Sequence, residues 1–228
     1  MQVSRFMLTA LAAVLAAATP AAAQLVPPNR PGWTPLNQHM PPGWNAELLV
    51  RAGVADPSWM QPVRVELPSE GTVQLYSGQP QPVLTGNSPA QFAVGVGHVY
   101  RLRVADLPEL PGVELYPSIE ILDRLHPPAG REHQFPIPIV LETADLKAAA
   151  DGLLVTRVIY LERPQTAAGD DPLRREEPLT LPSRENLVAA AALHGRPMVI
   201  LRIGGRIPAD GSAPPLFFGT GGMTAPAR

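Results

Sequence analysis

Proline constrains this chain more than any other residue, because it supplies 29 of the 228 residues, more than twice the usual share of about 5%. Its ring fixes φ and removes the backbone N–H, so proline is costly inside helices and tolerated in turns and edge strands. We therefore predict a mainly β fold. The specific expectation is an antiparallel, immunoglobulin-like β-sandwich with two short helices, the second leading to an extra C-terminal strand.

The N-terminal segment has the pattern of a secretory signal peptide. Arg5 supplies a positive charge, residues 6–18 are apolar, and residues 21–23 are three alanines after Pro20. We predict cleavage before Gln24, with residues 1–23 as the signal peptide. An uncleaved anchor is the alternative, but the apolar run is shorter than the roughly 18 residues of a spanning helix. We expect an exported protein that is periplasmic, cell-surface or secreted.

Composition narrows the classes of partner and cofactor. The chain has no cysteine, so disulfides cannot stabilise it. Its formal charge is −2 without any dense run of basic residues, which argues against a nucleic-acid partner. No stretch after residue 23 is long and apolar enough to span a bilayer. We expect no cofactor and no transmembrane segment once the signal is cleaved.

Residues 24–61 predict a Pro/Trp-rich extended arm that precedes the folded domain. Prolines recur through this segment with little hydrophobic alternation, and it holds all three tryptophans, Trp33, Trp44 and Trp59. A fully disordered linker rarely carries so much aromatic side chain. One interpretation is that the arm wraps the domain and docks its indoles in surface grooves. The other is that the tryptophans form a strip that binds a partner.

Residues 62–162 predict the β-sandwich domain. From Val63 apolar and polar residues alternate with period two, as in a strand with one wet face. Similar short segments follow at 73–75, 92–96 and 100–104, the spacing of a sandwich or barrel. Residues 113–121 predict one long strand bent at Pro117, paired with the segment 134–141 that follows it.

The spacing of two prolines predicts the position of residues 134–141 in the sheet. Pro136 and Pro138 are two residues apart, so both missing N–H donors fall on the same side of a strand. That side cannot pair with a neighbour. We therefore predict an edge strand whose proline side guards against edge-to-edge aggregation.

The C-terminal third predicts two helices and two strands. Thr143 can cap a helix over 144–150, and the run 153–161 is apolar on both phases, as in a central strand covered on both faces. Residues 163–182 predict an exposed charged loop. Residues 183–206 predict a helix capped by Ser183 and a strand, appended to the sheet edge or as a small unit, and residues 207–228 predict a flexible tail.

The sequence holds no established catalytic motif, and we assign no catalytic, cofactor-binding or metal-binding residue. Two sets of polar residues were weighed. Asp123, His126, Glu132 and His133 would come together in a hairpin and hold a metal, but their spacing fits no metal motif, so a solvated turn is the simpler interpretation. Glu114 and Glu120 share a strand face but lie about 20 Å apart, too far for a glycosidase acid pair, and are interpreted as solvent-face charges.

Several stretches of the chain resemble a group of exported hypothetical bacterial proteins. The resemblance covers roughly residues 62–206. It is carried by the following segments: GHVYRL at 97–102, LPGVELYP at 110–117, VTRVIYLE at 155–162, GRP at 195–197 and GR at 205–206. It implies an exported β-rich module and carries over no catalytic residue.

Two functions remain open from the sequence. The first is a non-catalytic module of the cell envelope that binds a protein or glycan partner or has a structural role, with the Trp-bearing arm as its contact strip. The alternative is a periplasmic or secreted hydrolase whose site is built from loops, which predicts a concave pocket with a carboxylate or histidine of shifted pKa.

Overall fold

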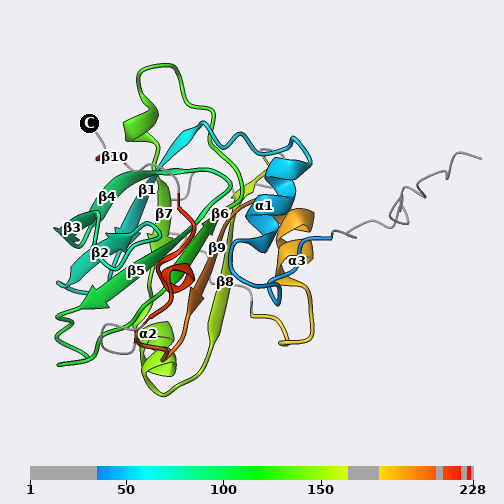
Figure 1. Ribbon diagram of the computed structural model, residues 1–228. Coiled ribbons are helices and arrows are strands. Elements are labelled where there is room, and N and C mark those ends of the chain that lie inside the picture. Colours follow the sequence, from blue (N-terminus) through cyan, green and yellow to red (C-terminus); the bar gives the residue numbers. More distant parts are fainter. Residues whose placement is uncertain (1–34, 164–179, 209–212, 222–224, 227–228) are drawn as a thin grey trace, which may run out of the picture.

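The computed structural model describes residues 35–163, 180–208, 213–221 and 225–226. The signal peptide expected at 1–23, Trp33, most of the 163–182 loop and parts of the 207–228 tail lie outside the described residues. Within them the prediction of a mainly β chain is confirmed: the strands form two sheets, accompanied by three α-helices (Figure 1).

The two sheets contain four and six strands. In spatial order, the smaller sheet comprises β10 (Ala225–Pro226), β4 (Ala90–Gly95), β1 (Met60–Glu66) and β7 (Ile137–Val140). The larger sheet comprises β3 (Leu84–Asn87), β2 (Thr72–Tyr76), β5 (Val99–Ala105), β6 (Ser118–Ile121), β9 (Gly195–Ile203) and β8 (Val155–Glu162). Neighbouring strands are antiparallel except β1 and β7, which are parallel.

The main core draws side chains from both sheets. In β1 the alternating residues Val63 and Val65 are fully buried, and so are Leu102 of β5 and Ile119 of β6. Because successive side chains of a strand point to opposite faces, each strand contributes one face to this core. The single long strand predicted over residues 113–121 is not found, because the regular strand begins only after Pro117. Leu115, Ile119 and Ile121 nevertheless all lie in the main core.

The edge position predicted for residues 134–141 is confirmed. β7 lies at the end of the smaller sheet, next to β1 alone. The Leu141 N–H donates to Glu66 O of β1 at 2.9 Å. Alternation then turns the Pro138 nitrogen away from β1, toward the open side. Proline thus occupies the one direction in which a missing donor costs no ladder hydrogen bond.

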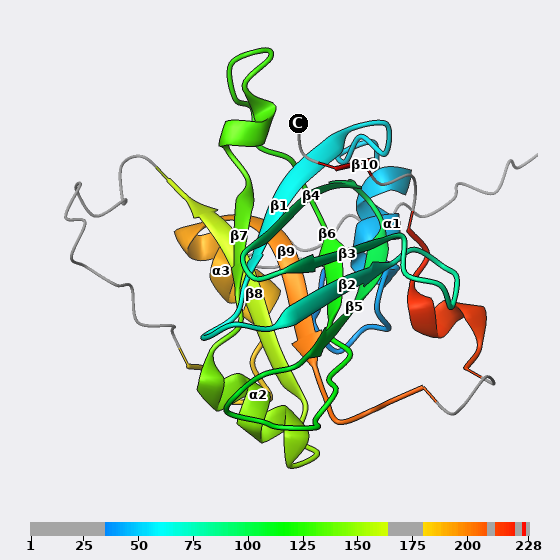
Figure 2. The same cartoon turned by 90° about the vertical axis from the view of Figure 1, so that its left-hand side faces the viewer.

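The partner predicted for this strand is wrong. β6 and β7 do not form a hairpin, because β6 lies between β5 and β9 in the larger sheet while β7 joins the smaller one. The connection between them, which includes the short 3₁₀ helix η1 (Glu132–Gln134), projects beyond the sheets (Figures 1 and 2). It carries the chain from one sheet to the other, which is why its turn composition misled the hairpin prediction.

The places predicted for the last two strands are reversed. β8, expected to be central, is the edge strand of the larger sheet, and β9, expected at an edge or in an appended unit, lies in the interior between β6 and β8. Residues 155–160 of β8 are half-buried. Helices pack beside β8, so its apolar pattern reflects covered faces and not a second strand neighbour.

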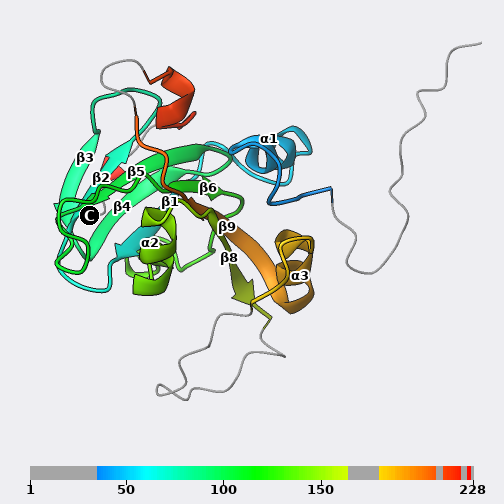
Figure 3. The ribbon, with the colours of Figure 1, turned by 90° about the horizontal axis from the view of Figure 1, so that it is seen from below.

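Three segments cover the face of the larger sheet that is turned away from the main core. They are α1 (Trp44–Arg51) with the chain before it, α3 (Leu187–His194), and the 3₁₀ helix η2 (Pro215–Phe218) (Figure 3). The third helix, α2 (Thr143–Ala150), precedes β8. Two short helices were expected and α1 was not, since it lies within the arm predicted to be extended.

The caps of the two expected helices also differ from the prediction. Asn186, not Ser183, caps α3, and its side chain accepts hydrogen bonds from the N–H groups of Val188 and Ala189. At α2 the N-cap residue is Glu142, and Thr143 is already the first helical residue.

The proline at the β7 edge can be tested directly. Replacing Pro138 with Thr restores an N–H on the open side, so we expect faster aggregation by edge pairing while the thermal midpoint changes little. Light scattering at rising concentration measures the first and circular dichroism the second. Pro128→Ala, in the exposed connection, is the matched control and should aggregate like the parent; equal aggregation of both variants would contradict the role of Pro138.

Candidate functional site

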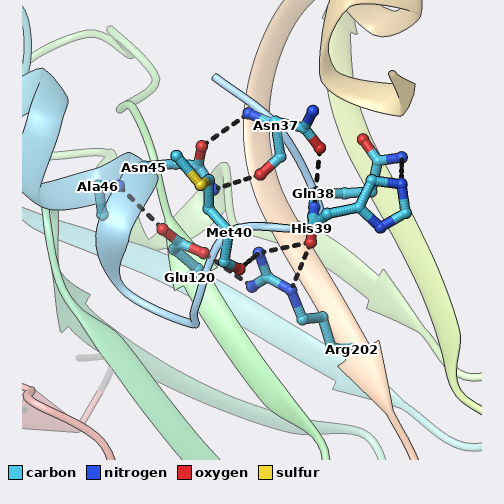
Figure 4. Close-up of polar contacts among 8 residues, drawn as sticks. All are labelled: Asn37, Gln38, His39, Met40, Asn45, Ala46, Glu120 and Arg202. Carbon is cyan, nitrogen blue, oxygen red and sulfur yellow. Dashed lines mark hydrogen bonds and ion pairs between the residues drawn. The ribbon is translucent and has the colours of Figure 1, made fainter. Parts of the chain in front are cut away.

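The outer face of the larger sheet holds two of the three buried charged residues of the described chain, the third being Asp145 of α2. Glu120 of β6 is fully buried and Arg202 of β9 is 7% exposed, and these strands are neighbours in the sheet. The interpretation of Glu120 as a solvent-face charge is therefore wrong. Its strand face is the outward one, as expected, but the N-terminal arm and α1 lie over it (Figure 4).

Glu120 and Arg202 form a buried ion pair. The Arg202 Nη1 donates to Glu120 Oε2 at 2.7 Å. The second carboxylate oxygen, Oε1, accepts the backbone N–H of Ala46 in the first turn of α1 at 2.9 Å. A carboxylate at this position satisfies a helix N–H that has no partner within the helix and interacts favourably with the helix dipole. Both oxygens of Glu120 are thus used by the chain itself.

Arg202 also holds the arm that precedes α1. Its Nε and Nη2 each donate to Gln38 O at 3.3 Å, and Nη2 lies 3.4 Å from Met40 O (Figure 4). The arm is closed on itself by Asn45, which accepts from Asn37 N–H at 2.9 Å and donates to Asn37 O at 3.1 Å. The guanidinium therefore holds this loop in place through direct hydrogen bonds to its backbone carbonyl oxygens.

The same arm fixes the start of α3. The Gln38 side chain donates to Glu185 O at 2.6 Å and accepts from Leu187 N–H at 2.9 Å. Asn186, the α3 cap, donates to Leu36 O at 2.7 Å. Residues about 150 positions apart in the chain are held together by amide side chains that satisfy backbone groups at both ends.

Arg101 of β5 holds the C-terminal segment against the sheet through hydrogen bonds to backbone carbonyl oxygens, as Arg202 holds the arm. Its Nε donates to Phe217 O at 2.7 Å, its Nη1 donates to Tyr116 O at 2.9 Å, and its guanidinium lies 4.4 Å from the centre of the Phe217 ring. Burial, together with the charge of Arg206, lowers the pKa of Arg101 to about 10. It still carries its charge at neutral pH, so the cation–π contact is retained.

The segment that Arg101 holds also needs a glycine. Gly219 has a φ of 96°, and a Cβ there would lie 2.4 Å from Val99 O. The next residue, Thr220, donates its N–H to that same oxygen at 2.9 Å. A side chain at position 219 would therefore displace the segment from β5.

A second polar group lies at the margin of this segment. Arg103 forms an ion pair with Glu114, and Tyr116 donates to Glu114 Oε2 at 2.9 Å. The hydrogen bond from Arg103 is the main cause that lowers the pKa of Glu114 to about 2. Burial, with the hydrogen bond to Glu114 next, raises the pKa of Tyr116 to about 12. The carboxylate stays ionised and the phenol stays protonated at neutral pH, which suits a structural contact better than proton transfer.

The four residues weighed as metal ligands do not form a site. Among the residues that the structure describes, no three His, Asp or Glu side chains are grouped as a metal ion would need. Asp123 pairs with Arg196 at 3.2 Å, and Glu132 accepts the N–H of Gly130 at 3.0 Å. His126 and His133 lie exposed on the projecting connection, where the solvated-turn interpretation placed them.

The two described tryptophans differ in their surroundings. Trp44, the first residue of α1, is 48% exposed. Trp59 is half-buried against the main core, and the Arg124 guanidinium lies 4.4 Å from its ring centre. Its Nε1 is buried and has no hydrogen-bond partner among the described residues. The arm thus docks one indole and exposes another, so each of the two interpretations of the arm fits one tryptophan.

A hollow that is open to solvent lies beside Thr72, the first residue of β2. It has a volume of about 470 Å³ and is lined by polar residues and glycine: Glu70, Gly71, Thr72, Asn87, Ser88 and Asp106. Thr72 donates its hydroxyl to Asp106 Oδ2 at 2.7 Å. Asp106 has a φ of 59°, an uncommon conformation for a residue other than glycine. Neither Glu120 nor Arg202 lines this hollow.

Sequence reasoning missed the Glu120–Arg202 pair, although a signal was present. Both residues interrupt runs that are otherwise apolar, at SIEI and MVILRI. A single charge in each of two apolar strands indicates a buried pair when the strands are neighbours. That neighbourhood was not visible in the sequence, because about 80 residues separate the two positions.

No family model, no curated protein and no solved structure matches the chain. Within the described residues, no helix is long and apolar enough to cross a membrane.

The buried pair predicts an asymmetric cost of substitution. Glu120→Gln leaves Arg202 charged and buried without a counterion, so we expect a loss of about 3–5 kcal/mol in the free energy of unfolding. Urea unfolding measures it, and limited proteolysis should then cleave within residues 35–46. Glu47→Gln, in the exposed pair with Arg51 on α1, is the matched control and should cost under about 1 kcal/mol. Similar losses in both variants would contradict the burial of the pair.

The Arg103–Glu114 pair predicts a pH dependence. The pKa of Glu114 is lowered in the folded chain from 4.5 to about 2. The stability from this pair is therefore fully present above pH 4.5 and is lost as the pH falls toward 2. Glu114→Gln should flatten that part of the stability curve, measured by urea unfolding across this range. Arg103→Gln removes the main cause of the shift and should flatten the same part; an unchanged acid limb in both would refute the assignment.

Proposed function

We propose that this protein is a non-catalytic, exported β-sandwich module of the cell envelope that binds a protein or glycan partner through α1. The finer fold assignment, an immunoglobulin-like sandwich, is part of this proposal and is supported by the core shared between two largely antiparallel sheets. Export is supported by the N-terminal pattern of residues 1–23 and by the resemblance of residues 62–206 to exported bacterial proteins.

The observation that carries the proposal is the presentation of Trp44. Its side chain is half exposed at the start of α1, and the buried Glu120 binds the same helix turn through Ala46 N–H. Gly43, with a φ of 93°, brings the helix start close to β5, since a Cβ there would lie 3.0 Å from Val99 Cγ1. A large aromatic side chain on a fixed support loses little entropy on binding, as in the anchor residues of protein interfaces.

The hydrolase alternative is not favoured by the contacts of Glu120 and Glu114. The buried Glu120 uses both its oxygens in contacts with the chain itself. Glu114 is held ionised by Arg103. General acid catalysis by a carboxyl group needs a raised pKa, the opposite of what Arg103 produces. The two carboxylates weighed from the sequence therefore support structural roles.

A glycan and a protein partner would use Trp44 in the same way. Indole rings stack on the apolar faces of sugars as well as on apolar protein side chains, and the ring N–H adds a hydrogen bond in either case. The experiment therefore offers both classes of partner, the soluble envelope proteins and the insoluble envelope polysaccharide, to the same pair of variants.

The decisive comparison is Trp44→Ala against Leu216→Ala. Leu216, on η2, is 75% exposed, so its truncation removes an exposed apolar side chain from a different element of the outer layer. Each purified variant is incubated with envelope extract and, separately, co-sedimented with insoluble envelope polysaccharide. We expect binding by the parent and by Leu216→Ala, with at least a tenfold loss for Trp44→Ala, since a central tryptophan contributes about 2 kcal/mol or more to an interface. Equal binding by all three, or binding by none, rules out α1 as the contact.

A further inference from the structure

Every sheet edge in the described part of the chain carries a feature that discourages pairing, except one. β7 has Pro138 facing outward, β10 has two residues and contains Pro226, and β3 has four residues with Gly86 among them. β8 has eight residues, VTRVIYLE, without proline or glycine. A long edge strand of β-branched and aromatic residues is a template for another strand.

The direction of the main-chain groups of β8 follows from one hydrogen bond. Arg163 N–H donates to His194 O, next to β9, at 3.4 Å. Successive residues of a strand turn their N–H and C=O groups to opposite sides. The odd-numbered residues of β8 therefore face β9, and the even-numbered Thr156 and Val158 turn their main-chain groups toward the open edge.

The two faces of β8 are already occupied. On one face Val158 packs against the apolar cluster that includes Val188 of α3. On the other face Arg157 forms an ion pair with Asp145 of α2, with Nη2 to Oδ1 at 2.8 Å. The strand is held firmly from both sides, so a partner reaches it along the edge and not across a face.

The exposed leucines around β8 are arranged symmetrically. Leu161, in β8, is 44% exposed, and Leu153, two residues before the strand begins, is 62% exposed. Each is four residues from Arg157 in the sequence, and the alternation of β8, extended two residues to Leu153, puts both on the same face. In an antiparallel pairing of two identical strands about Arg157, Leu153 of one copy lies opposite Leu161 of the other, twice. Val155 then faces Ile159, and Thr156 faces Val158.

We propose that two copies of this chain pair through their β8 edges, antiparallel about a twofold axis at Arg157, and join their six-stranded sheets into one. Thr156 and Val158 exchange main-chain hydrogen bonds across the axis. The pairs of Leu153 with Leu161 and of Val155 with Ile159 are apolar, Thr156 lies opposite the β-branched Val158, and such cross-strand pairs stabilise a sheet. A surface complementary to itself is the requirement for a twofold dimer. This dimer goes beyond the proposed function, which concerns α1.

The two Arg157 side chains at the axis do not oppose the pairing. Each is bound by the carboxylate of its own Asp145, which lies in a buried position and neutralises it locally. Like charges opposite each other in a sheet are destabilising when they are not compensated. In this dimer each Arg157 is already paired with the Asp145 carboxylate of its own chain.

Sedimentation equilibrium over a wide concentration range tests the dimer. The parent should show a reversible monomer–dimer equilibrium. Thr156→Pro removes an outward N–H and no bond to β9, so it should raise the dimer dissociation constant at least about tenfold, because two symmetry-related bonds are lost together. A parent that is monomeric throughout, or a dimer that Thr156→Pro leaves unchanged, overturns the proposal.

Charge exchange tests the register independently of proline. Leu153→Glu and Leu161→Lys should each weaken the dimer, and the double variant should recover it, because Glu at 153 then lies opposite Lys at 161 of the other copy. Both leucine side chains are exposed, and circular dichroism checks that each variant retains the fold. Leu216→Lys on η2 is the control and should dimerise like the parent. Failure of the double variant to recover the dimer overturns the proposed register. Weaker dimerisation of Leu216→Lys overturns the assignment of the dimer contact to the β8 edge.

Discussion

The buried ion pair between Glu120 and Arg202 is the contact on which the outer layer of the molecule depends. Removing two charges from water is costly, and the cost is offset only where the remaining hydrogen-bonding groups are also satisfied. Here the carboxylate accepts a hydrogen bond from Ala46 N–H, and the guanidinium donates to the carbonyl oxygens of Gln38 and Met40. A chain that detached the arm would leave both charges with unfilled hydrogen-bonding positions. The pair therefore specifies where the arm lies more than it adds to overall stability.

The same logic operates at the other end of the chain, where the Arg101 guanidinium donates to the carbonyl oxygen of Phe217 and lies over its ring. Together the two arginines bring the segments before β1 and after β9 onto one face of the larger sheet (Figures 1 and 3). This accounts for the burial of both faces of β9, which an antiparallel sheet with one wet face would not give. Covering the sheet also fixes α1, and with it the direction in which Trp44 is presented.

Sequence patterns predicted what depends on neighbouring residues and missed what depends on distant ones. The alternation at Val63 and the proline spacing at Pro138 report the face and the edge of a single strand, and both predictions are confirmed. The helix at α1 was missed because prolines on either side suggested an extended arm, while its start depends on contacts with β5 and β6. Glu120 was assigned to solvent because alternation reports a side chain's direction and not what covers it.

The reversal of β8 and β9 shows a limit of apolar patterns in general. A strand that is apolar on both phases has two covered faces, and in a parallel sheet that usually means a central position. Helices can cover both faces of an edge strand equally well, as α2 and α3 do for β8. The pattern then says nothing about the main-chain groups at the edge, because side chains point away from the sheet plane and hydrogen bonds lie within it. Proline alone does not mark an edge either, because the interior strands β1 and β9 contain Pro62 and Pro197. The spacing of Pro136 and Pro138 was informative because it puts two missing N–H donors on the same side of one strand, and that side can have no paired neighbour.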